Sequence, residues 1–193
     1  MTPILIIVAV SLSALFITLG TGANAAFTTP KNSSAIAMKF AFFMSVSYFC
    51  FYYIGVWISK FLLGMMTGEM LVLTAAILFF TVAVKTVWNV FSYKVEDNAY
   101  NLSKTAIQLL LSVAGGFNAL LLSIGLTLFQ ATMFANIPAL VLKTALIVTL
   151  GAFTGSMSGA KLSVETAKKV TKLRPAIIGA AVMLALAVYL FLK

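Results

Sequence analysis

The sequence predicts an all-α polytopic membrane protein, and composition, segment length and charge placement support this fold class. Of the 193 residues, 62% are hydrophobic and 9% are charged, and the mean hydropathy is +1.10. Apolar runs of about 20 residues recur along the chain, which is the length that an α-helix needs to cross a bilayer. These runs lack the alternation of polar and apolar residues that a membrane β-barrel requires.

Six membrane-spanning helices are expected along the chain. They cover residues 3–25, 36–62, 69–92, 104–129, 134–159 and 175–192. The first contains Ala23-Asn24-Ala25, which imitates a signal-peptide cleavage site, but no positively charged segment precedes its apolar run. We therefore expect this segment to remain as a spanning helix.

Basic residues gather in the connections after the first, third and fifth predicted helices. They are Lys31, Lys39, Lys94, Lys104, Lys161, Lys168, Lys169, Lys172 and Arg174. The other side carries only Lys60 and the terminal Lys193. Because cytoplasmic loops carry the excess of Lys and Arg, we expect a multi-pass protein of the cell (inner) membrane with both termini on the non-cytoplasmic side. The formal charge of +9 is then a topology signal rather than a footprint for nucleic acid.

The residue inventory argues against an enzyme and against a cofactor. The chain has no histidine and a single cysteine, Cys50. It therefore has no intrachain disulfide and no CxxC redox motif. No acid–base pair or nucleophile–base arrangement lies within the predicted spans.

A polar connector divides the chain into two halves of three helices each. The stretch "SYKVEDNAYNLSK" (92–104) holds Glu96 and Asp97, two of the four acidic residues. We expect a single membrane domain, 1–193, composed of repeat 1 (1–92), a connector (93–103) and repeat 2 (104–193). With three crossings in each half, the second half enters the membrane from the opposite side, which predicts an inverted repeat.

An internal similarity supports this repeat. A shift of 105 positions places "AVSLSALFITLGTG" (9–22) on "AGGFNALLLSIGLT" (114–127). Ser13 then corresponds to Asn118, and Thr18 corresponds to Ser123. A carboxamide in hydrocarbon costs several kcal/mol unless it is hydrogen-bonded, so Asn118 is expected to face protein or water. Two interpretations stay open for it: a polar contact between helices, and a contact to a substrate.

Around these residues the chain resembles the MntP-type manganese efflux pumps of the lysine-exporter superfamily. In that family each half carries a motif like S-[ML]-D-A, followed after a short apolar stretch by a small residue, an aliphatic residue and glycine. The counterparts here are "SLSALFITLG" (11–20) and "GFNALLLSIG" (116–125), and the similarity continues through "TLGAFTG" (149–155) and "IIGAAVMLALAVYLF" (177–191). The resemblance implies six helices in two halves, an outward N-terminus and export of a divalent cation.

The chain departs from that family at the intramembrane carboxylates. The family's two motif aspartates correspond to Ser13 and Asn118. Where members usually place a glutamate in the second helix, "FFMSVSYFCFYY" (42–53) offers Ser45, Ser47 and tyrosines. Mn²⁺ prefers carboxylate, carbonyl and water ligands, so neutral oxygens leave its charge uncompensated. The transported ion therefore stays open between Mn²⁺ and another small ion, and the metal ligands stay unknown.

Two lysines lie inside predicted spans, Lys85 and Lys143. A long lysine stem can lie in lipid while its ammonium reaches the interface. We expect this of Lys85, because Trp88 and Tyr93 mark the nearby cytoplasmic boundary. Snorkelling is equally open for Lys143, for which the alternative is that its ammonium lies near Asn118 and neutralises an anionic substrate.

The sequence thus predicts a secondary transporter that resembles divalent-cation efflux pumps, in which one half moves against the other around a midplane site. The candidate substrate-binding residues are Ser13, Thr18, Asn118, Ser123, Ser47 and Lys143. A cation would also need backbone carbonyls released by helix breaks near Gly20 and Gly125. The alternative is a non-transporting structural or accessory subunit of a larger membrane complex. The expected partners are the lipid bilayer and a small ion, and the sequence is compatible with a homo-oligomer or a membrane-complex partner.

Overall fold

The computed structural model describes residues 3–26, 34–92, 102–131 and 137–192, and the described residues form helices and no strand. The helices are α1 (Pro3–Ala26), α2 (Ser34–Leu63), α3 (Gly68–Ser92), α4 (Thr105–Ala131), α5 (Ile137–Ala160), α6 (Val164–Leu173) and α7 (Pro175–Phe191). The expected all-α class is confirmed. Residues 93–101 of the predicted connector and residues 134–136 of the segment predicted at 134–159 lie outside the described residues.

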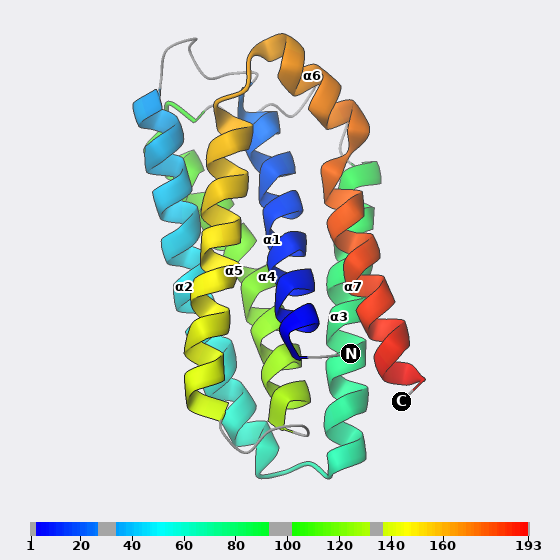
Figure 1. The fold of residues 1–193 in the computed structure, drawn as a ribbon. Coiled ribbons are helices and arrows are strands. Elements are labelled where there is room, and N and C mark those ends of the chain that lie inside the picture. Colours follow the sequence, from blue (N-terminus) through cyan, green and yellow to red (C-terminus); the bar gives the residue numbers. More distant parts are fainter. Residues whose placement is uncertain (1–2, 27–33, 93–101, 132–136, 193) are drawn as a thin grey trace.

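The long helices stand side by side (Figure 1), and their mutual contacts form a closed ring. Going round it, α1 contacts α5, α5 contacts α2, α2 contacts α4, α4 contacts α3, α3 contacts α7, and α7 contacts α1. The α1–α5 and α2–α4 contacts are the most extensive, whereas α1 and α4 touch each other only slightly. α1, α3 and α5 run toward the end of the bundle that α6 covers, and α2, α4 and α7 run away from it (Figure 1).

Glycines on α5 let α1 approach at backbone contact. A Cβ on Gly155 would collide with the Leu15 carbonyl and the Thr18 hydroxyl, and a Cβ on Gly151 would come within 2.8 Å of the Ser11 carbonyl oxygen. From the α1 side, a Cβ on Gly22 would meet the Ser156 carbonyl at 2.5 Å. Small residues at such interfaces allow close packing in lipid, where no hydrophobic force draws helices together.

The α2–α4 contact combines glycines with large side chains. A Cβ on Gly115 of α4 would lie 2.7 Å from the Met44 sulfur and 3.3 Å from the Tyr48 ring. Both of these α2 side chains are fully buried. Further along, Gly55 of α2 leaves no room for a Cβ beside the Ser123 hydroxyl. Large residues on one helix thus fill the space that small residues leave on the other.

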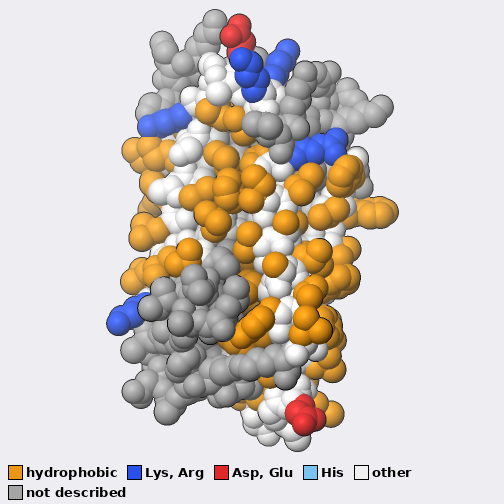
Figure 2. Space-filling model, turned by 45° about the vertical axis from the view of Figure 1, so that its right-hand side comes forward, with side chains coloured by type: hydrophobic (Ala, Val, Ile, Leu, Met, Phe, Trp, Pro, Cys, Tyr) orange, Lys and Arg blue, Asp and Glu red, His pale blue; other side chains and the backbone are white. Residues whose placement is uncertain are grey.

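The outer surface of the bundle is apolar along most of its length. Hydrophobic side chains predominate in the middle of the face in Figure 2, and most charged side chains there lie nearer its ends. Among the described residues, four stretches are long and apolar enough to cross a membrane. They are Ala35–Leu63, Gly68–Asn89, Thr105–Phe129 and Glu165–Phe191, and α1 contributes the shorter apolar stretch Val10–Ala23. These features identify a membrane protein.

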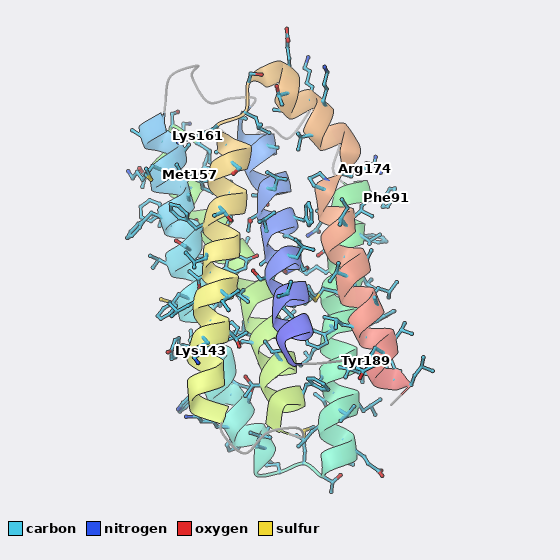
Figure 3. All side chains as sticks on the ribbon, in the orientation of Figure 1. Phe91, Lys143, Met157, Lys161, Arg174 and Tyr189 are labelled. Atoms are coloured by element: carbon cyan, nitrogen blue, oxygen red, sulfur yellow. The ribbon has the colours of Figure 1, made fainter. Side chains whose placement is uncertain are left out.

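α6 is not among the helices expected from the sequence. It lies across one end of the bundle, where Ala167 is fully buried and Lys168 and Lys169 are exposed (Figure 1). The chain turns from α6 into α7 at Arg174, whose φ of 46° lies in the left-handed region that non-glycine residues rarely adopt. The Arg174 guanidinium lies 4.6 Å from the centroid of the Phe91 ring, a cation–π contact that ties this turn to the end of α3 (Figure 3).

Candidate functional site

Asn118 forms a polar contact with Lys85 across the α3–α4 boundary. The Lys85 ammonium donates a hydrogen bond to the Asn118 carboxamide oxygen at 2.9 Å. Asn118 is 9% exposed and Lys85 is half-buried. The carboxamide oxygen thus has the partner that an apolar environment demands. The expectation that Lys85 snorkels to the interface is wrong, because its ammonium points to Asn118 instead.

The direction of α3 explains the orientation of Lys85. In an α-helix every Cα–Cβ bond tilts toward the N-terminus. α3 runs toward the α6 end, so its side chains tilt away from that end (Figure 1). Lys85 lies seven positions before Ser92, the last residue of α3, which is about 10 Å along the axis. Asn118 lies thirteen positions after the start of α4, about 20 Å along its axis. The lysine therefore extends toward the middle of the bundle.

Ser13, the counterpart of Asn118 in the first half, contacts a different helix. Its side chain is fully buried, and its hydroxyl donates to the Gly179 carbonyl of α7 at 3.0 Å. A Cβ on Gly179 would lie 2.9 Å from the Ser13 carbonyl oxygen, so this glycine permits the approach. Ser13 and Asn118 therefore each bridge to a neighbouring helix, but only Asn118 meets a charge.

Thr18 and Ser123 are packing positions in the structure. The Thr18 hydroxyl donates to the Ala14 carbonyl at 2.8 Å, and the Ser123 hydroxyl donates to the Leu120 carbonyl at 2.8 Å. Both side chains are almost completely buried. Their protons are used within their own helices, and a substrate contact for either residue stays a prediction.

Ser47 has a buried hydroxyl that lacks a hydrogen-bond partner, and the neighbouring Tyr48 hydroxyl shares this state in the described part of the chain. A Cβ on Gly116 of α4 would lie 2.5 Å from the Ser47 oxygen, so the hydroxyl lies in the α2–α4 seam. A buried polar group without a partner costs about 1–3 kcal/mol. Together with the buried Tyr52 hydroxyl, these are polar groups of α2 with hydrogen-bonding capacity to spare.

Lys143 is exposed on α5, toward the end of the bundle opposite α6 (Figure 3). One of the two expectations for Lys143 places its ammonium near Asn118. An ammonium does contact Asn118, but it belongs to Lys85. The sequence did contain a signal for Lys85. The order of the spans gives the direction of α3, and the tilt of the Cα–Cβ bonds along that direction points the Lys85 side chain toward the middle of the bundle.

The described residues provide neutral oxygens and a cation at this site rather than carboxylates. They contain no cluster of three or more His, Cys, Asp or Glu side chains that could hold a metal ion. Glu69 in the first turn of α3 and Glu165 on α6 are both exposed, and Glu96 and Asp97 lie outside the described residues. The backbone adds no free ligands at the two candidate glycines. α1 continues through Gly20 and α4 continues through Gly125, so the helix breaks that a cation site would need there do not occur.

Comparison of the chain with protein-family models, with curated proteins and with solved structures finds no match.

Proposed function

We propose that this chain is a secondary transporter of a small ion, built from two inverted halves of three membrane-spanning helices each. The first half comprises α1, α2 and α3, and the second comprises α4, α5 and α7. The halves move against each other and expose a midplane site beside Asn118 and Ser13 to the two sides of the membrane in turn. The observation that carries this proposal is the exchange symmetry of the helix contacts.

Exchanging the halves replaces α1 by α4, α2 by α5 and α3 by α7. Under this exchange the α1–α5 contact becomes α4–α2, and the α1–α7 contact becomes α4–α3, both of which exist in the ring. The α2–α5 and α3–α7 contacts exchange with themselves. Each contact of the ring therefore has its counterpart. Together with the opposite directions of α1 and α4, this supports two inverted halves (Figure 1).

The same relation extends to residues in the two most extensive contacts. One contact uses Leu15, Thr18 and Gly155, and the other uses Leu120, Ser123 and Gly55. In each, the glycine leaves no room for a Cβ between the leucine carbonyl and the hydroxyl of the facing helix. The α1 residues match the α4 residues after a shift of 105 positions, and the glycines match after a shift of 100. The first two helices of one half thus correspond to the first two helices of the other after nearly the same shift along the sequence.

The polar contacts of the proposed site follow the exchange as well. Ser13 of α1 bonds to α7, and Asn118 of α4 bonds to α3. The pairs α1–α7 and α4–α3 are equivalent under the exchange. The resemblance to manganese efflux pumps implies substrate ligands at Ser13 and at Asn118. The Lys85 ammonium beside Asn118 disfavours Mn²⁺, because a cation near it would be repelled.

Charge placement supports an orientation in the membrane. The α6 end carries Lys39, Lys104, Lys161, Lys168, Lys169 and Arg174, whereas the described basic residues toward the other end are Lys60 and Lys143. By the positive-inside rule the α6 end is cytoplasmic, and both termini face outward across the cell (inner) membrane.

Flux into proteoliposomes tests the proposal. Purified protein is reconstituted, and movement of Mn²⁺ and of chloride is measured under imposed gradients. We expect protein-dependent flux that Asn118→Leu abolishes, because this substitution removes the carboxamide at similar volume. Lys60→Gln, an exposed substitution far from Asn118, should leave the flux unchanged.

Flux that Asn118→Leu does not alter would contradict the proposed site. A chain that moves neither ion and co-purifies with a stable partner would favour the alternative, a structural or accessory subunit of a membrane complex.

A further inference from the structure

We infer that Lys85 and Asn118 form a binding site for a small monovalent anion. This inference names the substrate class of the transporter proposed above, and its role in transport rests on that proposal. Anion binding itself rests on the geometry of the Lys85–Asn118 pair.

The Lys85 ammonium carries a charge that its partner does not neutralise. An ammonium has three N–H donors, and the hydrogen bond to Asn118 uses one of them. A carboxamide oxygen has no net charge. Glu69 lies on the same helix sixteen positions earlier, which is about 24 Å along the axis. Glu165 is exposed on α6. Among the described residues, therefore, no carboxylate faces the ammonium.

The orientation of Lys85 keeps its charge away from the membrane interface. Its Cα lies about 10 Å from the end of α3, and its side chain extends further from that end to reach Asn118. A lysine that neutralises itself with lipid headgroups extends the opposite way. The charge is thus held inside the apolar layer, where an uncompensated ion is costly.

Asn118 supplies further donors at the same place. Its oxygen accepts from Lys85, which leaves its amide N–H₂ group as a donor. The pair therefore presents several N–H donors and one positive charge, and no acidic group. Chloride, nitrate or a short carboxylate matches this set, because each supplies one negative charge and accepts several hydrogen bonds.

Anion-dependent stability tests the site. The full-length protein in phosphatidylcholine nanodiscs is heated in sodium chloride, nitrate or acetate, with sodium gluconate as the reference at constant ionic strength. Because a ligand that binds only the folded state stabilises it, we expect a saturable rise in Tm of a few degrees with at least one of the small anions. Lys85→Gln should remove the rise, whereas Lys85→Arg and the distant Lys60→Gln should retain it.

Asn118→Asp provides a second variant that keeps a hydrogen-bond acceptor beside Lys85. Its carboxylate neutralises the ammonium from within the protein, so the rise in Tm should disappear even if Lys85→Gln does not fold. The inference is overturned if the wild type shows no saturable rise, or if the rise persists in Lys85→Gln or Asn118→Asp. It is also overturned if phosphatidylglycerol in the nanodisc replaces the small anions in a Lys85-dependent way, because the ligand is then a lipid headgroup.

Chloride flux separates this inference from the proposed function. Lys85-dependent anion binding without any flux would retain the site and contradict the transporter. Cation flux that Lys85→Gln leaves unchanged would retain the transporter and contradict the anion site.

Discussion

The two faces of α4 differ in how they hold their neighbours. Toward α2, Gly115 and Gly116 bring the helix against large side chains, and Ser123 fits against Gly55. Toward α3 the approach is less tight, because a Cβ on Gly125 would lie 3.1 Å from the Phe79 ring, and the polar contact is a hydrogen bond from the flexible side chain of Lys85 to Asn118. Backbone-level packing resists small displacements, whereas a long side chain can keep or release a partner with little rearrangement. We therefore assign the glycine faces to the rigid frame of the bundle and the polar face to the site.

The largest expected effect is at the α1–α5 glycine face. Gly155→Ala places a methyl group against the Leu15 carbonyl and the Thr18 hydroxyl. Because a backbone carbonyl cannot move away cheaply, we expect a loss of about 2–3 kcal/mol in unfolding free energy, measured by denaturant titration in detergent. Gly20→Ala is the matched control in α1. Its nearest contact would be 3.7 Å, so it should be neutral or stabilise slightly. Equal losses of unfolding free energy in Gly155→Ala and Gly20→Ala would show that the close α1–α5 packing is not the cause of the loss.

Gly55→Ala should cost about 1–2 kcal/mol at the α2–α4 face in the same titration. Here the methyl group meets the Ser123 hydroxyl, which can rotate, but it also lies 2.7 Å from the Leu120 carbonyl. Gly64→Ala serves as control, because its nearest contact would be an ordinary 3.6 Å. No loss in Gly55→Ala would contradict the equivalence of this face with the α1–α5 face.

The Lys85–Asn118 contact between α3 and α4 should contribute a smaller free energy of unfolding, and this contribution should require both side chains. A double-mutant cycle with Lys85→Met and Asn118→Leu should give a coupling of about 1 kcal/mol, the size of a strong hydrogen bond between membrane helices. The cycle is measured by the same unfolding titration. Additive effects of the two substitutions would show that the contact does not contribute to the folded state.

Ser13→Ala should have the smallest effect. It removes one neutral hydrogen bond to Gly179, so we expect a loss of about 0.5 kcal/mol in unfolding free energy. If the loss exceeded that of Asn118→Leu, the charged contact would not be the stronger of the two bridges.

Much of the frame could be predicted from the sequence. Span length and apolar content predict the long helices, because each residue contributes independently to these averages. α6 was missed, since its ten residues are mostly polar and its stability depends on packing Ala167 against the bundle. The glycines of α5 recur at i+4 spacing, at Gly151, Gly155 and Gly159, but spacing alone does not identify which helix packs against them.

The site could be predicted only in part. Asn118 is conspicuous because a carboxamide in an apolar run needs a partner. Trp88 and Tyr93 favoured the interface for Lys85, whereas the tilt of the Cα–Cβ bonds along α3 directs its side chain the opposite way. Gly179 offered no signal, because every residue has a backbone carbonyl that can accept a hydrogen bond, and a single glycine in an apolar helix does not indicate which helix it faces.

Accessibility of Lys60 and Lys161 tests the inverted halves most directly. A shift of about 100 positions relates these two exposed residues, so they occupy equivalent places in the two halves. Cys50, the only native cysteine, is first replaced by alanine, and Lys60→Cys and Lys161→Cys are then made singly. A membrane-impermeant maleimide added to intact cells should label Lys60→Cys and leave Lys161→Cys unlabelled until the membrane is opened. Labelling of both positions from the same side would contradict the inverted arrangement.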